Sequence, residues 1–424
     1  MKAIAAFALL LCLTASCALA QEWPTLGHDA QRTGYSISSA PETNQIAWTF
    51  NGAGSFSSPT VADDKVFIGS EDGYIRAINV INGKEVWNFK AEEVASPTFA
   101  DGRIYTGSRG MVYCLDAATG ENLWSYPTDG AIYSAPAVIG NVVYVTSTDN
   151  YVYAINATSG QLLWGNNLGS KITSSPAVAS DIVFVSTWDG RVYALHTSDG
   201  FEVWHFQVVE NGMLENYPII SSPSIAGGCV YVGSNDWHLY VLDVATGEDR
   251  WEFEAGNQIE FSPAVADNVV YFGSSDGYVY ALDARNNVEN RVLWNYPTGD
   301  RVQSSPAVAD NKVFITSQNG YLYSLNALDG TLIWMHHIGK VGRASPAVAY
   351  GKVFIGTSEG KLYCFGSWGP VPGGDIWKGV IYLFITALLV LALWWLIRLK
   401  PSSSKKRRRT SKKLKKNSGG VVEI

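Results

Sequence analysis

Short runs of alternating hydrophobic and polar residues recur along most of the chain, and the clearest copy lies at residues 262–294. In its third run, Tyr278, Tyr280 and Leu282 alternate with smaller or polar residues. A Ser-Asp-Gly turn precedes that run, and β-branched and aromatic residues fill the run before it, which is typical of antiparallel hairpins. The pattern predicts four short strands, at residues 263–266, 269–274, 278–284 and from Leu293 onward.

Copies of this unit follow one another along the chain, and two residue series mark them. A proline preceded by Ser or Ala marks the first strand: Pro59, Pro97, Pro136, Pro176, Pro223, Pro263, Pro306 and Pro346. A tryptophan marks the fourth: Trp48, Trp87, Trp124, Trp164, Trp204, Trp251, Trp294 and Trp334. A period of about 40 residues with four strands per unit is the signature of a β-propeller.

The two series are offset, and the offset predicts how the ring closes. Trp48 precedes every marker proline, whereas the eighth unit, residues 345–366, has three strands and no tryptophan. We therefore expect the strand around residues 46–50 to complete the last blade, which pairs the two sheet edges that would otherwise be open. The predicted fold is all-β, an eight-bladed propeller of four-stranded antiparallel blades at residues 46–367, followed by one transmembrane α-helix.

The N-terminal residues are typical of a secretory signal. Residues 1–20 combine Lys2, an apolar run and an Ala-Leu-Ala site before Gln21, which predicts a cleaved signal peptide. The run ending at Cys17 also faintly resembles a lipoprotein box, so lipidation of Cys17 stays open. Residues 21–45 form a lead-in before the first strand.

The C-terminal residues predict a membrane anchor. After a Pro/Gly linker at 368–376, the segment 377–398 holds 19 uncharged residues in a row, about 28 Å of helix at 1.5 Å per residue. The tail at 399–424 is rich in Lys and Arg, which stay cytoplasmic. We therefore expect a single-pass protein of the cell membrane with the propeller outside and the basic tail inside, near anionic lipid headgroups.

Charge is divided sharply between the two parts. Residues 21–376 contain 18 Lys+Arg and 37 Asp+Glu, a net charge of −19, whereas the residues after 397 carry +10. An acidic propeller argues against nucleic acid as its partner. Envelope or membrane proteins, or surface glycans, are the partners that we expect, with the lipid bilayer contacted through 377–398.

The segment from the third strand to the tryptophan carries a family resemblance. Residues 115–124 read LDAATGENLW, and residues 154–164 and 241–251 repeat the pattern. This motif resembles the tryptophan-docking repeat of the pyrroloquinoline-quinone (PQQ) propeller family, and residues 23–35 are similar to the segment before such repeats. The resemblance implies a blade docked by one large aromatic side chain, with glycine at the turn.

The same resemblance leaves several functions open. Some members are dehydrogenases of alcohols or sugars that hold PQQ and calcium, whereas others are scaffolds without a cofactor, one being similar to the propeller lipoprotein of the bacterial outer-membrane β-barrel assembly machine. This chain lacks the adjacent cysteine pair of the dehydrogenases, their long insertions and a haem-attachment motif. We therefore predict a non-catalytic binding or scaffold module without a cofactor. A PQQ-dependent dehydrogenase and a carbohydrate-binding adhesin remain the alternatives.

Other candidate chemistry is sparse. Cys114, Cys229 and Cys364 are expected to be small buried residues without disulfides, because they lie far apart around the ring. The recurring turn aspartates are expected to stabilise turns rather than bind metal. Asn156 begins an Asn-Ala-Thr sequon and is a glycosylation candidate.

Departures from the repeat predict the binding surface. The connection from Trp204 to Pro223 has about eight extra residues, and two neighbouring turns carry tryptophan where other units have small or polar residues. We expect these three features to share one face, where exposed aromatic residues beside carboxylates suit a sugar, a peptide or a cation. Loop drift with self-packing tryptophans is the competing interpretation. The candidate residues are Trp188, Asp189, Glu210, Glu215, Tyr217, Asp236, Trp237 and His238.

Overall fold

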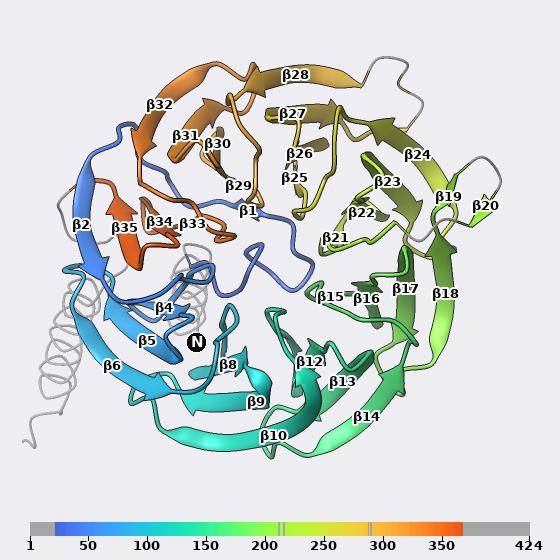
Figure 1. Cartoon of the computed structure of the whole chain (residues 1–424), viewed down its shortest axis with the longest axis horizontal. Helices are drawn as coiled ribbons and strands as arrows, with labels where there is room; N and C mark the ends of the chain where they lie inside the picture. Colours follow the sequence, from blue (N-terminus) through green and yellow to red (C-terminus); the bar gives the residue numbers. More distant parts are fainter. Residues whose placement is uncertain (1–21, 211–212, 215–216, 287, 289–290, 368–424) are drawn as a thin grey trace, which may run out of the picture. The chain divides into compact units, whose positions relative to one another are not determined.

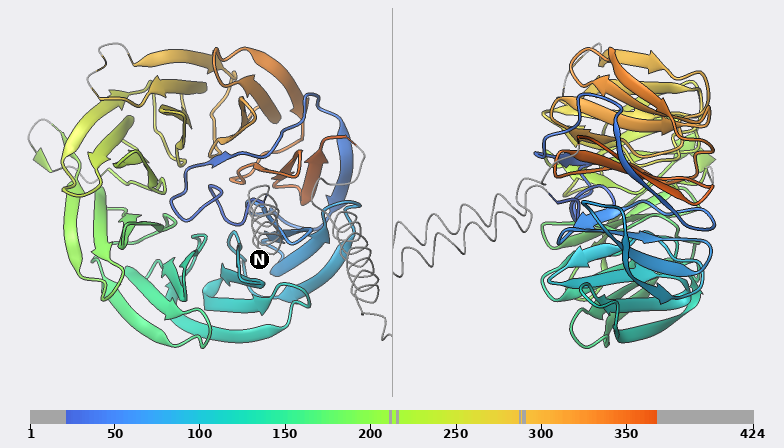
Figure 2. Two further views of the ribbon diagram at one scale, coloured as in Figure 1. Left: turned by 180° about the vertical axis from the view of Figure 1, so that it is seen from behind. Right: turned by 90° about the vertical axis from the view of Figure 1, so that its left-hand side faces the viewer.

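Eight β-sheets surround a central axis in the computed structural model (Figure 1). The structure describes residues 22–210, 213–214, 217–286, 288 and 291–367. Figure 2 shows the ring from behind and edge-on. The predicted signal peptide (1–20), linker (368–376), membrane helix (377–398) and tail (399–424) lie outside the described residues. Within the described part of the chain, no helix is long and apolar enough to cross a membrane.

Each blade is an antiparallel sheet whose first strand is innermost and whose fourth is outermost (Figure 1). Blade 1 contains β3 (Thr60–Ala62), β4 (Lys65–Gly69), β5 (Tyr74–Asn79) and β6 (Glu85–Lys90). Blade 2 contains β7 (Thr98–Ala100), β8 (Arg103–Gly107), β9 (Arg109–Asp116) and β10 (Asn122–Ala131). Blade 3 contains β11 (Ala137–Ile139), β12 (Val142–Thr146), β13 (Tyr151–Asn156) and β14 (Leu162–Asn167). Blade 4 contains β15 (Ala177–Ala179), β16 (Ile182–Ser186), β17 (Arg191–His196) and β18 (Glu202–Gln207).

The second half of the ring repeats this order. Blade 5 contains β21 (Ser224–Ala226), β22 (Cys229–Gly233), β23 (His238–Asp243) and β24 (Asp249–Glu254). Blade 6 contains β25 (Ala264–Ala266), β26 (Val269–Gly273), β27 (Tyr278–Asp283) and β28 (Val292–Pro297). Blade 7 contains β29 (Ala307–Ala309), β30 (Lys312–Ser317), β31 (Tyr321–Asn326) and β32 (Leu332–His337). Blade 8 contains β33 (Ala347–Ala349), β34 (Lys352–Gly356), β35 (Lys361–Phe365) and β2 (Ile46–Asn51).

The predicted closure of the ring is confirmed. Strand β2 pairs antiparallel with β35, with Trp48 opposite Cys364, so the two ends of the propeller share one sheet. Two features depart from the expected blades of four strands. Strand β1 (Tyr35–Ser36) pairs parallel with β29 and makes blade 7 five-stranded. The long connection after blade 4 forms a small hairpin of β19 (Val209–Glu210) and β20 (Met213–Leu214).

Neighbouring blades are joined on the outside by the marker tryptophans. In seven of these tryptophans the indole Nε1–H donates to a backbone carbonyl oxygen at 2.9–3.2 Å. The donor–acceptor pairs are Trp48–Val80, Trp87–Ala117, Trp124–Ala157, Trp164–Thr197, Trp204–Val244, Trp294–Ala327 and Trp334–Pro41. Burying a large aromatic side chain and satisfying its only polar atom explains why tryptophan recurs here.

The serine before each marker proline joins the blades on the inside. A backbone N–H just before the first strand of one blade donates to the serine Oγ of the next blade at 2.8–3.2 Å, with acceptors Ser96, Ser175, Ser222, Ser262, Ser305, Ser345 and Ser58. In blade 3 Ala135 takes the place of the serine. Two concentric rings of hydrogen bonds therefore hold the sheets together.

The lead-in runs through the central channel, a role that its sequence did not predict (Figure 1). Trp23 pairs with Val61 of blade 1, and first-strand N–H groups of five further blades donate to lead-in carbonyl oxygens at 2.7–2.8 Å. The guanidinium of Arg32, 1% exposed, donates at 2.7 Å to the carbonyl oxygens of Leu26, Ala135 and Pro176. Burial lowers the pKa of Arg32 to about 9, which leaves it charged at neutral pH.

Candidate functional site

One face of the ring carries every departure that the sequence singled out. We call it the mouth face; it is formed by the turns between second and third strands and by the connections between blades. Residues 217–222 of this connection lie between the turns of blades 4 and 5: the N–H of Ile219 donates to the Thr187 carbonyl oxygen at 3.1 Å, and the N–H of Asn235 donates to that of Pro218 at 3.2 Å. The described end of the long connection therefore lies beside both tryptophan-bearing turns.

Trp188 is 40% exposed but is held in place by its own blade. Its Nε1–H donates to Thr173 Oγ1 at 2.8 Å, and the Lys171 ammonium lies 3.9 Å from the centre of its ring. This cation–π contact and the hydrogen bond orient the indole before any partner arrives. The Nε1 edge and one face of the Trp188 ring are thus engaged within the protein.

Trp237 is 46% exposed and has an unusual backbone conformation, with φ = +81°. At the same turn position, blades 1, 4, 6, 7 and 8 have glycine with φ between +76° and +89°, and blade 3 has Asn150. A bulky residue with positive φ is a strained exception, costing of order 1–3 kcal/mol. Trp237 occupies the fourth position of its turn and Trp188 the second, so the two turns present their tryptophans differently.

The two turn aspartates of the candidate set are engaged within their own blades. Asp189 accepts hydrogen bonds from Thr187 Oγ1 at 2.5 Å and from the Arg191 guanidinium at 2.6 Å. Asp236 accepts from the His238 N–H at 3.0 Å and from the Tyr240 hydroxyl at 2.6 Å. Burial and this carboxylate raise the pKa of Tyr240, so its hydroxyl remains a donor.

The remaining candidates differ in how much of them faces solvent. The His238 ring is half-buried and stacks on Tyr240, with ring centres 5.7 Å apart. Tyr217 is half-buried against the core between blades 4 and 5. Glu210 lies in β19, and Glu215 is outside the described residues. Asn156 ends β13 on the opposite face, where its Oδ1 accepts the N–H groups of Thr158 and Ser159.

A cavity of about 620 Å³, which we call the cup, opens at the centre of the mouth face. Trp188 is among its lining residues, together with all seven of the serines that precede the marker prolines. Leu26 of the lead-in also lines it, so the segment inside the channel closes the inner end. A volume between 300 and 1,000 Å³ is typical of ligand pockets.

Charged and aromatic side chains that the sequence analysis missed line the cup. They are Phe56, Glu71, Glu93, Tyr133, Lys171, Glu260, Phe261 and Arg343. Glu93 is paired with Arg109, whereas the Glu260 side chain is 14% exposed and its Oε2 has no hydrogen-bond partner among the described residues. Most of these residues lie between a marker tryptophan and the next marker proline, and that position in the repeat is the signal that could have revealed them.

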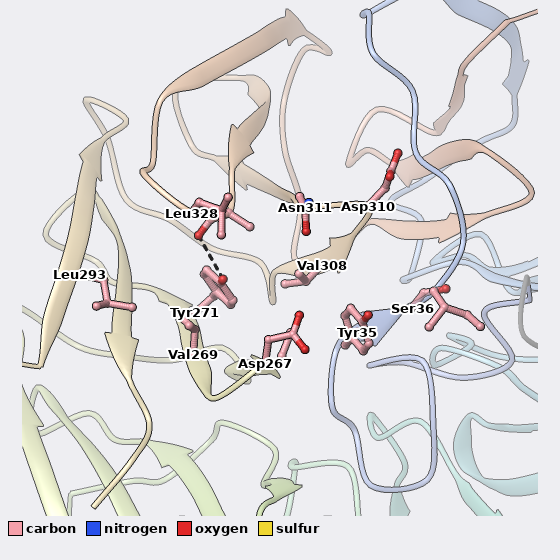
Figure 3. Close-up of a pocket in the computed structure, with 13 residues that line it drawn as sticks. Tyr35, Ser36, Asp267, Val269, Tyr271, Leu293, Val308, Asp310, Asn311 and Leu328 are labelled. Atoms are coloured by element: carbon pink, nitrogen blue, oxygen red, sulfur yellow. Dashed lines mark hydrogen bonds between the residues drawn. The ribbon is translucent and has the colours of Figure 1, made fainter. Parts of the chain in front are cut away.

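A second cavity of about 290 Å³ lies on the opposite face between blades 6 and 7 (Figure 3). Tyr35 of the lead-in, Leu293 and Leu328 contribute to its wall, and the Tyr271 hydroxyl donates to the Ala327 carbonyl oxygen at 3.1 Å. Ile37, Leu293 and Leu328 are exposed around it. The wall combines these apolar residues with the polar side chains of Asp267, Asp310 and Asn311.

The described residues do not match the donor set of a calcium-held quinone. Ca²⁺ takes six to eight oxygen ligands, largely from carboxylates. Among the described residues, no group of three or more His, Cys, Asp and Glu side chains is placed to hold a metal ion. The three described cysteines, Cys114, Cys229 and Cys364, are free and buried, as expected. We therefore derive no redox step for this site.

Comparison with known proteins identifies a family. The sequence model of the family described as outer membrane protein assembly factor BamB matches residues 30–98, 72–211, 148–289 and 263–367, which together extend over the whole propeller.

Curated relatives match shorter stretches of the chain. The serine/threonine-protein kinase AfsK of Streptomyces coelicolor is 37% identical over 89 residues, which is 21% of this chain and 11% of the kinase. The quinohemoprotein alcohol dehydrogenase of Comamonas testosteroni is 27% identical over 138 residues, 27% of this chain and 20% of the enzyme. BamB of Moranella endobia is 28% identical over 127 residues, 25% of this chain and 33% of BamB. Each match thus spans at most 33% of the relative's length.

Solved structures share the fold. BamB from Moraxella catarrhalis superposes with a TM-score of 0.64 at 18% identity, covering 76% of this chain and 99% of that one. A quinohemoprotein alcohol dehydrogenase from Pseudomonas putida superposes with a TM-score of 0.72 at 14% identity, covering 84% and 81%. Identities this low establish a common architecture, which scaffolds and enzymes both use.

Proposed function

The chain belongs to the outer membrane protein assembly factor BamB family, and from that premise we propose that its propeller is a non-catalytic binding module for envelope or membrane proteins. Relatives named BamB are assembly factors rather than enzymes, which supports this role. The mouth face is the proposed docking surface, since it carries Trp188, Trp237 and the extra hairpin together. Tryptophan is prominent among the residues that dominate protein interfaces.

The backbone of Trp237 is the observation that carries this proposal. Six of the seven four-residue turns of this kind use glycine or asparagine at the strained position, and glycine adopts it without a steric cost. A tryptophan there stores strain and still leaves its ring 46% exposed. Strain of this kind clusters at binding and active sites, where it is part of the function.

We further propose that residues 377–398 anchor the module in the cell membrane. The 19 uncharged residues in this segment support the anchor, and the +10 charge beyond residue 397 supports a cytoplasmic tail near anionic headgroups. In this arrangement, the propeller lies on the extracytoplasmic side of the membrane once the signal peptide, residues 1–20, has been removed. Protease added to intact cells should digest the propeller and spare the tail; a protected propeller would reverse this orientation.

The docking surface is tested by replacing Trp237→Gly in the full-length protein. Glycine relieves the strain, so the free energy of unfolding should stay the same or rise by up to about 1 kcal/mol. Crosslinking to envelope proteins in native membranes should fall tenfold or more, about 1.4 kcal/mol of binding free energy. Asn150→Gly makes the same backbone change in blade 3 and is the matched control. If Trp237→Gly melts well below wild type while crosslinking survives, the ring is a core residue and the docking surface is wrong.

The alternatives make different predictions. One curated relative is a quinohemoprotein alcohol dehydrogenase. If this protein were a dehydrogenase too, the full-length protein supplied with PQQ, calcium and an alcohol or sugar would reduce an artificial electron acceptor. A carbohydrate-binding adhesin would retain specific glycans on an array through Trp188. Saturable, PQQ-dependent turnover would refute the non-catalytic role, whereas glycan binding without protein crosslinks would favour the adhesin.

A further inference from the structure

Glu260 is a half-buried residue whose carboxylate oxygen Oε2 is buried without a hydrogen bond among the described residues. It lines the cup, its side chain is 14% exposed, and no donor among the described residues lies within hydrogen-bond distance of Oε2. A buried charged group without hydrogen bonds costs several kcal/mol in general. Such a group therefore points to a donor that is supplied from outside the fold.

Arg343 shows that a guanidinium fits near this carboxylate. Its Nη2 lies 4.0 Å from Glu260 Oε2, which is too far for a hydrogen bond, and its side chain is 72% exposed. Ion pairs of this exposed kind contribute about 0–1 kcal/mol. Arg343 therefore interacts only weakly with Glu260, and a cation from a partner that lies closer to the carboxylate can displace it.

The aromatic lining of the cup and the acidic propeller sequence also favour a cation. Glu93 is paired with Arg109, so the remaining charged groups of the lining are the carboxylates of Glu71 and Glu260 and the cations of Lys171 and Arg343. Exposed Tyr133 and Trp188 supply aromatic faces on which a guanidinium can stack. The wider ectodomain sequence carries −19, so positively charged partners are steered toward it.

We infer that the cup receives an arginine side chain of the protein partner, held by Glu260 and flanked by Tyr133 and Trp188. The planar guanidinium offers five donors, enough to satisfy the buried carboxylate and to contact nearby serine hydroxyls. A neutral sugar would supply hydroxyl donors but would bring no positive charge to the carboxylate, which has only the exposed Arg343 at 4.0 Å. This inference rests on the proposed function, since it specifies the chemistry of the same protein partner.

The test uses the full-length protein and two blocked pentapeptides, one with a single central arginine and one with citrulline, which has the same shape without the charge. Fluorine NMR of fluorotryptophan-labelled protein reports on Trp188, whose signal is assigned with Trp188→Phe. The arginine peptide should shift this signal saturably and the citrulline peptide should not.

Two substitutions should move the affinity in opposite directions. Glu260→Gln should weaken arginine-peptide binding at least tenfold, whereas Arg343→Ala, which removes the internal competitor, should strengthen it about two- to fivefold. Glu121→Gln removes one negative charge from the opposite face and should leave the affinity unchanged. Equal binding of the citrulline peptide, an unaffected Glu260→Gln variant, or a Trp188 shift with methyl glucoside alone would overturn the inference. Continued loss of crosslinks in Trp237→Gly would then still support the docking surface, so the two proposals can fail separately.

Discussion

Trp251 shows how much a docking tryptophan depends on the turn of the next blade. The other seven marker indoles donate to a carbonyl oxygen, whereas Trp251 Nε1 has no partner among the described residues. The following turn lacks the glycine that lies against the marker tryptophan at six other seams, and Arg291 lies over the indole instead, 3.9 Å from the ring centre. A cation–π contact thus replaces a hydrogen bond at this seam.

Gly160 meets both requirements of a regular docking turn, a positive φ and close contact with a tryptophan. Its φ is +71°, and a Cβ there would lie 2.8 Å from the Trp124 ring. Gly160→Ala should lower the free energy of unfolding by about 2 kcal/mol, measured by urea denaturation, because it adds overpacking to backbone strain. Gly140→Ala, with φ = +55° and nothing within 4 Å of the added Cβ, measures the backbone part alone and should cost less. Equal losses would show that the ring contact is unimportant.

At the scale of the element, the turn after the third strand is stabilised by a side chain that ends that strand. Asp116, Asn156 and Asp243 each accept two N–H groups from the residues that follow. Asp243 also binds the Arg250 guanidinium. These carboxylate and amide acceptors hold the turn that packs on the preceding blade.

The turn of blade 5 should make stability depend on pH. The Arg250 guanidinium and the N–H groups of Ala245 and Thr246 lower the pKa of Asp243 from 3.8 to about 2. Because the folded-state pKa is the lower one, the stabilisation is present above about pH 4 and is lost as the pH falls toward 2. Asp243→Asn should be less stable than wild type at neutral pH and should lose less on acidification, measured as urea midpoints. Parallel curves for the two proteins would contradict this assignment.

At the scale of the whole molecule, the N-terminal residues contribute to stability twice. Strand β2 closes blade 8, and the lead-in joins the inner strands through the channel. The two contributions act at different radii, with Trp48 on the outer ring and Arg32 at the centre. The ring is therefore held closed by residues from the N-terminal part of the same chain.

Ring closure predicts that the interface between blades 8 and 1 contributes as much to the free energy of unfolding as any other interface between neighbouring blades. Trp48→Ala at that seam and Trp164→Ala between blades 3 and 4 should each lower the free energy of unfolding by about 3–5 kcal/mol, because both remove a buried indole with one hydrogen bond. Thermal and urea unfolding measure both. A much smaller loss for Trp48→Ala would mean that the ring opens easily where its ends meet.

The candidate site was only partly predictable. Trp188 and Trp237 break a regular repeat, so the sequence alone singles them out and places them on one face. Glu260, Lys171 and Arg343 share a repeat position, between a marker tryptophan and the next marker proline, but the residue type there differs from blade to blade, so the sequence does not single them out. Their proximity depends on the ring bringing residues of blades 4, 6 and 8 around one cavity.

The sequence by itself determined the number of blades, the strand order and the closing strand, because these follow from local alternation, turn residues and a repeated tryptophan. Tertiary structure decided the path of the lead-in, the strain at Trp237 and the unsatisfied carboxylate of Glu260. The physical reason is that hydrogen bonds between distant segments and the backbone angle of a turn depend on neighbours that local sequence does not specify.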